Sequence, residues 1–278
     1  MSKIKELRSD LQQTETAQFV TTMLRDISAT KLQSIRVAYE KNVLYYNDLH
    51  ELMSLIKYHA KKSGVSTETN KKQMYIALTA NRRFYGNVNT QVITLLKNSI
   101  FEQDNNGACM VIGQTGVQAL SYDEELKKNT LHEKVFEKEQ PSSKEIADII
   151  EDVRMYGDVK VIHPFFVNSF EQKAVVTDMT HYAQTGDITE KMQFDYIFEP
   201  DLPVLLNFFR DHIRTLLFRR ILLETQLALT AARLMKMQSA RDRASEIVKQ
   251  KRLNIHRQMR MIQNMRLLET FTGFIDKK

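Results

Sequence analysis

Apolar side chains in the first sixty residues recur at alternating intervals of three and four positions. The spacing holds in two stretches, with polar members at Thr14 and Asn42: Ile4, Leu7, Leu11 and Thr14, then Ile35, Tyr39, Asn42, Tyr46, Leu49, Met53 and Ile56. No Gly or Pro interrupts these residues. One narrow stripe at this spacing is typical of a coiled-coil seam rather than of a broad globular face. The pattern therefore predicts a long shaft helix over residues 1–60, with a shift of register between the two stretches.

The pattern changes over residues 61–203. Small and polar residues at 61–73 predict a loop, and apolar runs then alternate with amphipathic segments. They predict strands at Met74–Thr79, Ala108–Gly113, Val159–Ile162 and Lys173–Thr177, and a helix at Asn89–Ile100. A further helix is expected after Ser142, which can form a capping box with Glu145. This alternation predicts a small central α/β domain with a mostly parallel sheet, and the charged stretch 123–141 predicts an exposed excursion with some helix.

A second long helix is predicted for residues 204–278. No Gly or Pro occurs between Pro203 and Gly273, and an unbroken helix of that span measures roughly 100 Å. It must project beyond a compact central domain, and its apolar side chains then need a partner: Leu222, Leu223, Leu227, Leu234 and Ile247. Since residues 1–60 carry the other long apolar stripe, we expect the two terminal helices to pair as a long antiparallel coiled coil.

Composition and charge limit the class of protein. Hydrophobic residues make up 42% of the 278 residues and charged residues 27%, which is ordinary for a globular chain that folds. The single cysteine, Cys109, excludes an internal disulfide and is expected to be a small core residue. No run of 18 apolar residues and no signal peptide is found, so no membrane-crossing segment is expected.

The net charge of +6 is unevenly distributed. From Leu205 to the end, 16 Lys and Arg face six Asp and Glu, a surplus of ten positive charges. A basic helix of this kind is compatible with three kinds of partner: a nucleic acid, an acidic membrane surface or an acidic protein collar.

Motifs of catalytic chemistry were searched for and not found. Gly113 and Gly116 are too close together for a phosphate-binding loop and lack a following Lys, so we expect a turn between two strands. The seven His are scattered, and one Cys cannot build a zinc cluster. His163, expected at a strand end before Pro164, is assigned a structural role. The sequence therefore predicts no catalytic residue, no metal site, no cofactor and no enzyme activity of the chain by itself.

Short motifs spread along the whole chain carry a family resemblance. In chain order they are Val20-Thr21 with Lys31-Leu32, Leu78 to Asn89 with Arg82 and Gly86, Val111 to Gly113 with Gly116, Tyr196 to Pro200 with Glu199, Ala231 to Met237 with Arg233, and Asn254, Arg257-Gln258 and Gly273. Over essentially its full length the chain resembles the γ subunit of F-type ATP synthases.

That resemblance implies a non-catalytic central-stalk rotor subunit, which couples conformational changes of a catalytic α/β hexamer to rotation. It implies paired helices inside the hexamer, a foot that engages an ε-type subunit and a membrane rotor ring, and a cytoplasmic place at the inner face of the cell membrane. Nucleic acid is not expected as a partner. The implied hexamer contacts are Arg257, Gln258, Arg233, Met237 and Lys31, and the implied foot contacts are Arg82, Tyr196 and Glu199.

Some positions depart from the family pattern. Ala228-Leu229 stand where the family has Ser-Glu, and the I-T-x-E motif is replaced by Met261 to Asn264, without its Thr and its acid. These departures leave open a γ-like shaft of a paralogous ATPase motor that is not coupled to proton-driven ATP synthesis.

Two other classes are kept as alternatives. A basic coiled-coil adaptor would bind DNA in a salt-sensitive way, and a small α/β enzyme would need a pocket with perturbed titratable groups.

Overall fold

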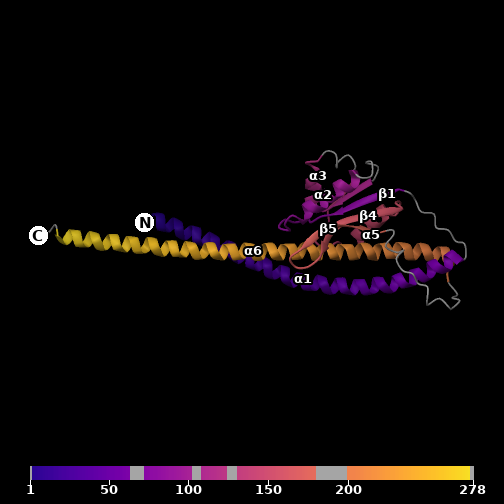
Figure 1. The fold of residues 1–278 in the computed structure, drawn as a ribbon, viewed down its shortest axis with the longest axis horizontal. Helices are drawn as coiled ribbons and strands as arrows, with labels where there is room; N and C mark the ends of the chain where they lie inside the picture. Colours follow the sequence, from indigo (N-terminus) through magenta and orange to yellow (C-terminus); the bar gives the residue numbers. More distant parts are fainter. Residues whose placement is uncertain (1, 63–71, 102–107, 124–129, 180–198, 276–278) are drawn as a thin grey trace. The chain divides into compact units, whose positions relative to one another are not determined.

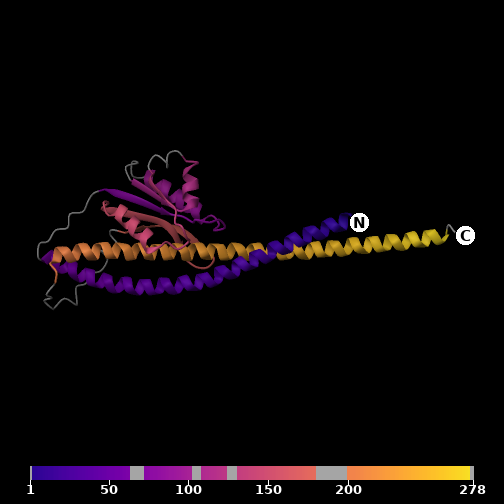
Figure 2. The ribbon, with the colours of Figure 1, turned by 180° about the vertical axis from the view of Figure 1, so that it is seen from behind.

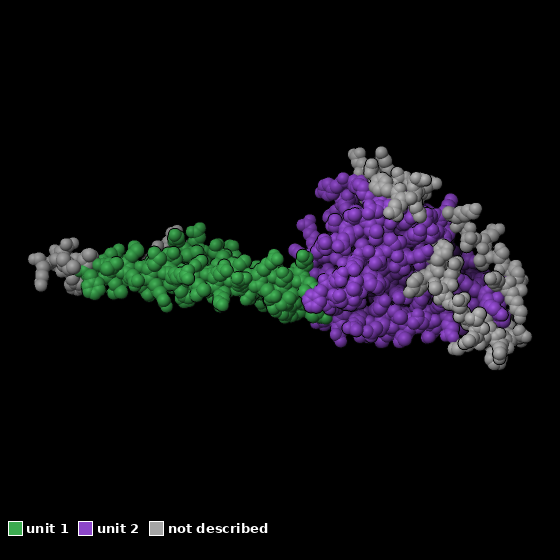
Figure 3. Space-filling model, in the orientation of Figure 1, with its two compact units in different colours: residues 1–29, 234–278 green, residues 30–233 purple. Residues whose placement is uncertain are grey.

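The computed structural model describes residues 2–62, 72–101, 108–123, 130–179 and 199–275. They form two compact units, unit 1 of residues 1–29 and 234–278 and unit 2 of residues 30–233 (Figure 3). Helix α1 (Ser2–Lys62) and helix α6 (Leu202–Ile275) each contribute residues to both units. The two predicted terminal helices are confirmed, and α6 continues through Gly273. The predicted boundaries at residues 60 and 203 stay predictions, since the compact units divide the helices elsewhere.

Unit 2 contains a five-stranded sheet in the order β3-β2-β1-β4-β5. The strands are β1 (Gln73–Leu78), β2 (Ala108–Ile112), β3 (Thr130–Lys134), β4 (Asp158–Phe166) and β5 (Gln172–Asp178). Strands β3, β2, β1 and β4 run parallel to one another, and β5 pairs antiparallel with β4. The predicted central α/β domain with a mostly parallel sheet is confirmed (Figure 1).

Helices cover both faces of this sheet within unit 2. On β1, Met74, Ile76 and Leu78 point to one face, while Tyr75 and Ala77 point to the other, as the two-residue period of a strand requires. The first face packs against α5 (Ser143–Val153), α1 and α6, and the second packs against α2 (Val88–Phe101) and α3 (Gln114–Leu120) (Figure 2). The predicted capping box of Ser142 and Glu145 begins α5.

The helix pair of unit 2 is antiparallel. Tyr39 on α1 donates a hydrogen bond to Glu224 on α6 at 3.5 Å, and further along α1 the ring of Tyr46 lies 5.6 Å from the guanidinium of Arg220. Residue numbers therefore increase along α1 while those of the contacted residues on α6 decrease, so the two helices run in opposite directions. The predicted seam is confirmed, because its second stretch is buried or half-buried throughout, with Ile35 and Met53 at 1% and 4% exposure.

Three expectations about local structure are corrected. Ile247 does not enter the seam but is 44% exposed. The described part of the stretch 123–141 contains strand β3 at Thr130–Lys134 and no helix, and its side chains are exposed or half-buried. His163 does not end a strand, because β4 continues to Phe166.

The glycines at 113 and 116 do not form a turn between two strands. Gly113 has φ +108° and precedes the first residue of α3, and a Cβ at this position would lie 2.3 Å from the carbonyl oxygen of Thr79. A Cβ on Gly116 would lie 2.6 Å from Val111. Both positions need glycine, because α3 starts in close contact with β1 and β2.

Three further predictions concern the cysteine, membrane-spanning helices and the loop after α1. Cys109 is fully buried on the sheet, which confirms its expected core role. Among the described residues, no helix combines the length and apolar character of a bilayer-spanning segment. Most of the predicted loop at 61–73 lies outside the described residues.

Candidate functional site

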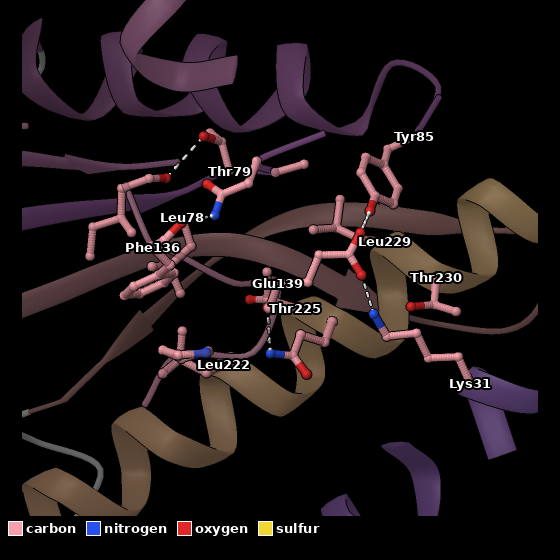
Figure 4. A pocket seen from close by; sticks show the side chains of 15 residues that line it. Lys31, Leu78, Thr79, Tyr85, Phe136, Glu139, Leu222, Thr225, Leu229 and Thr230 are labelled. Atoms are coloured by element: carbon pink, nitrogen blue, oxygen red, sulfur yellow. Dashed lines mark hydrogen bonds and ion pairs between the residues drawn. The ribbon is translucent and has the colours of Figure 1, made fainter. Parts of the chain in front are cut away.

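A single carboxylate in unit 2 contacts side chains from both long helices and from the central α/β domain, which is also called the sheet domain below. Glu139 lies between β3 and α5, and its carboxylate accepts a hydrogen bond from Lys31 of α1 and one from the hydroxyl of Tyr85 at 3.1 Å. Arg233 of α6 and Arg82 each approach it to 3.4 Å. We call these five residues the Glu139 junction, and Figure 4 shows Glu139 with Lys31 and Tyr85.

Local structure fixes the parts of the junction that come from the sheet domain. Arg82 and Tyr85 belong to the turn after β1, which the side chain of Asn89 closes by accepting from the amide of Ala80 at 3.0 Å. Asn81 in the same turn donates to the carbonyl of Phe136 at 3.0 Å and so joins the turn to the segment that carries Glu139. The junction therefore rests on residues of β1, of its turn and of the segment after β3.

Helix α6 contacts both the backbone and the side chain of Glu139. The side-chain amide of Gln226 donates from Nε2 to the backbone carbonyl oxygen of Glu139 at 3.0 Å, and Gln226 lies two turns before Arg233. The guanidinium of Arg233 also lies over the ring of Tyr85, 4.5 Å from its centroid. A cation over an aromatic face is attracted by the ring quadrupole, so Arg233 is held on two sides.

The charges of the junction are unequal, with one carboxylate among three cations. Burial by itself would raise the pKa of Glu139, but the hydrogen bond and charge of Lys31 and the charge of Arg233 outweigh it, and the pKa is lowered. Burial and then the neighbouring Glu139 raise the pKa of Tyr85 to about 12, against the lowering by Arg233. At neutral pH Glu139 is therefore ionised, and Tyr85 is a neutral donor.

A small cavity of about 50 Å³ lies beside the junction. Its lining includes the ends of β1 and β2 and two turns of α6 between Leu222 and Thr230, with Thr225 and Gln226 among them. Thr225 Oγ1 and Gln226 Oε1 are buried without a hydrogen-bond partner among the described residues. A cavity of this size holds about three or four water molecules, which would satisfy these two oxygens.

The structure brings together three residues that the sequence assigned to two different contacts. Lys31 and Arg233 were predicted to contact the hexamer, and Arg82 was predicted to contact the foot partners. All three point to Glu139, and the Lys31 and Arg233 side chains are only 29% and 16% exposed. Their immediate partner is therefore inside the chain, and their contacts with other subunits stay predictions.

The other predicted contact residues differ in exposure. Met237 in unit 1 is 6% exposed. Arg257 is exposed and Gln258 is half-buried on the same stretch of α6. Glu199 is exposed just before α6, and Tyr196 lies outside the described residues.

Unit 1 leaves large apolar side chains uncovered on both of its helical stretches. On α6 they are 57–65% exposed: Met261, Met265, Leu267, Leu268 and Phe271. On α1 they are 47–65% exposed: Phe19, Val20, Met23 and Ile27. Patches of this kind usually mark a surface that another protein covers.

Two members of the junction, Glu139 and Tyr85, were not predicted from the sequence. Glu139 stands among similar charged residues, and nothing in the sequence separates it from Glu133 or Glu137. Tyr85 lies between Arg82 and Gly86 in the motif from Leu78 to Asn89, but the motif assigned it no contact. Both residues owe their burial to partners far away in the sequence, which spacing cannot reveal.

Comparison with known proteins gives a consistent picture at the level of sequence. A family model described as ATP synthase matches residues 3–265. The ATP synthase gamma chain of Clostridium acetobutylicum is 28% identical over 240 residues, which cover 82% of each chain. That of Clostridium novyi is 23% identical over 247 residues, which cover 86% of this chain and 85% of the other.

Solved structures share the fold at lower identity. The rotor of the Euglena gracilis mitochondrial ATP synthase matches with a TM-score of 0.63 at 12% identity, covering 94% of this chain and 99% of that one. The central stalk and c-ring structure of the Tetrahymena thermophila mitochondrial ATP synthase contains a chain that matches with a TM-score of 0.61 at 17% identity, covering 80% and 99%.

Proposed function

This chain belongs to the γ-subunit family of F-type ATP synthases, and from that premise we propose how its parts take part in rotation. It is a central-stalk rotor subunit of a rotary ATPase, not the catalytic one. In our proposal the helices of unit 1 are seated in the catalytic α/β hexamer, and unit 2 transmits their rotation to partners at the foot.

The uncovered apolar side chains of unit 1 carry this proposal. Burial of apolar surface is the main favourable term in association, and five large side chains from Met261 to Phe271 are more than half exposed. Arg257 and Arg260 directly precede them on α6, and Arg266 lies among them. A helix that is apolar with scattered arginines suits a protein sleeve lined by apolar groups and carboxylates, since Arg engages a carboxylate at two points.

The partners at the foot are the second part of the proposal. A related assembly is described as containing F1 and a c-ring, which supports a rotor ring as one partner of unit 2. We further propose an ε-type subunit as the other, with Arg82, Tyr196 and Glu199 among the contacts. The complex would then lie at the inner face of the cell membrane, with this chain peripheral to the bilayer.

The test exchanges one pair of residues in the assembled complex. Arg257→Ala with Gln258→Ala is expected to lower ATPase turnover several-fold without preventing assembly, because it removes the charged contact to the hexamer. The matched control is Lys249→Ala with Gln250→Ala, an exposed pair of the same kind on the same helix. Surface charges of this type usually contribute little, so turnover of the control is expected to stay near the native value.

Lys251 is not a suitable control, because it has partners within unit 1. Its ammonium donates to Thr14 Oγ1 at 2.9 Å and to the carbonyl of Asp10 at 3.1 Å within unit 1.

The same variants separate the rotor from a DNA-binding adaptor. Equal, salt-dependent losses of DNA affinity in both variants, with turnover unchanged, would speak for the adaptor and against the rotor.

A further inference from the structure

The Glu139 junction sits at the two points where the long helices pass into unit 2. Unit 2 comprises residues 30–233, so Lys31 is its second residue and Arg233 its last. Any twist that travels along α1 or α6 from unit 1 enters unit 2 at these positions. Both of them contact the same carboxylate, which is itself carried by the sheet domain; Figure 4 shows the contact of Lys31.

Apolar packing alone does not fix the rotation of a helix against a sheet. The first face of the sheet meets α1 and α6 through aliphatic side chains such as Met53, Ile56 and Leu217. The hydrophobic effect is non-directional, so these contacts oppose separation more than they oppose a small turn or slide. Charge-assisted hydrogen bonds have a preferred geometry and are roughly twice as strong as neutral ones.

Three directional contacts from the helix pair converge on one residue of the sheet domain. Lys31 and Arg233 contact the carboxylate of Glu139, and Gln226 contacts its carbonyl oxygen at 3.0 Å. Another ion pair between α6 and the sheet domain joins Asp211 to Arg154, but its side chains are 38% and 66% exposed. Exposed pairs are weak and screened by salt, whereas the Glu139 side chain is 21% exposed.

We propose that Glu139 is a positioning residue that locks both long helices against rotation relative to the α/β domain, so that torque crosses from helices to foot through this carboxylate. The inference rests on the proposed rotor function and adds the place where the rotor transmits torque. Tyr85 and Arg82 hold the carboxylate from the sheet side, while Lys31 and Arg233 hold it from the helix side.

The experiment measures twist in the assembled complex. The catalytic hexamer is fixed to a surface, a bead is attached to the α/β domain of this chain, and the angular variance of the bead is recorded while the rotor is stalled. Glu139→Gln keeps the shape and removes the charge. Because charge-assisted bonds are roughly twice as strong as neutral ones, the contacts of Lys31 and Arg233 with this side chain are expected to weaken by about half, and the variance is expected to rise by up to about twofold.

The matched control is Glu40→Gln. Glu40 pairs with Arg36 one turn away on α1, with both side chains largely exposed, so the same chemical change touches no contact between elements. Its variance is expected to equal that of the native complex. ATPase turnover without load is expected to be similar in all three complexes, because the hexamer contacts of unit 1 are unchanged.

One further variant, Lys31→Gln, keeps the test decisive if Glu139→Gln does not assemble. Lys31→Gln removes the contact from α1 alone and is compared with Arg36→Gln, and it is expected to raise the variance by a smaller amount. In a Lys31→Gln chain, Glu139→Gln is expected to add less than it does alone, since the two share an interaction.

The outcomes separate the two proposals. A native complex that hydrolyses ATP without turning the α/β domain would overturn the rotor function and this inference with it. Normal rotation with equal variance in Glu139→Gln, Lys31→Gln and their controls would overturn the inference alone.

Discussion

One buried side chain of unit 2, the imidazole of His163, has hydrogen-bond partners that fix its protonation. His163 on β4 has no exposed surface. Its Nδ1 lies 3.0 Å from the carbonyl oxygen of Pro164, which can only accept, so Nδ1 carries the proton. Its Nε2 then accepts from the hydroxyl of Thr177 on β5 at 2.9 Å. The ring therefore joins the parallel part of the sheet to its antiparallel edge in the neutral form.

This arrangement predicts a pH dependence of stability. Burial lowers the pKa of His163 to about 4, against the raising effect of the Pro164 carbonyl. The unfolded chain takes up a proton near pH 6.5 and the folded chain does not, so the free energy of unfolding is highest above pH 6.5. It is expected to fall by roughly 3 kcal/mol as the pH drops from 6.5 to 4.

Urea unfolding of the native chain and of His163→Gln at pH 7.5 and 4.5 checks this expectation. In His163→Gln, the free energy of unfolding is expected to change less with pH, because the uptake of about one proton on unfolding is lost. His132→Gln, a change at an exposed position, is expected to keep the native dependence of this free energy on pH. An unaltered slope in His163→Gln would contradict the assignment.

At the scale of elements, the helix pair depends on a narrow seam. Met53 is 4% exposed, whereas its neighbour Leu52 is 50% exposed. One residue along a helix turns the side chain by about 100°, which is enough to move it from the sheet and the partner helix into solvent. The seam therefore tolerates little change on one side and much on the other.

The neighbouring pair gives a matched test. Met53→Asp is expected to lower the free energy of unfolding by several kcal/mol, because an unpaired carboxylate loses its hydration. Leu227→Asp, at 6% exposure on α6, is expected to do the same. Leu52→Asp is expected to change it little. Circular dichroism during thermal unfolding distinguishes these outcomes, and similar midpoints for Met53→Asp and Leu52→Asp would show that Met53 does not lie in the seam.

At the scale of the whole molecule, charge and apolar surface act in opposite directions. The net charge of +6 opposes self-association, while the uncovered apolar residues of unit 1 favour it. As a rotor subunit the chain is expected to meet partners that cover these residues.

The chain purified without partners is therefore expected to self-associate. Replacing Met261, Met265 and Leu268 by Gln is expected to reduce this association while the thermal midpoint stays unchanged, because all three are more than half exposed. Light scattering as a function of concentration measures the effect. The corresponding triple change at exposed polar sites, Gln250, Asn254 and Gln263 to Ser, serves as the control. A monodisperse native chain would show that the apolar residues need no cover.

The sequence by itself determined the long helices, their pairing and most strands, because these depend on local periodicity and on the placement of Gly and Pro. The stripe from Ile35 to Ile56 and the run without breakers after Pro203 needed no tertiary information. The fold class and the family followed from these patterns and from motifs that keep their order. The sequence did not predict strand β3 or helix α3. Strand β3 lies in a charged stretch, and α3 directly follows Gly113, which has no Cβ and can therefore lie in close contact with Thr79.

Only the tertiary structure decided where charges meet. Glu139 looks like its acidic neighbours in sequence, yet folding places it between Lys31, 108 positions before it, and Arg233, 94 positions after it. Such contacts depend on how helices pack on the sheet and not on local spacing. The motifs assigned Lys31, Arg82 and Arg233 to contacts with other subunits. In the structure all three contact one carboxylate inside the chain, because the packing of the helices on the sheet brings them there.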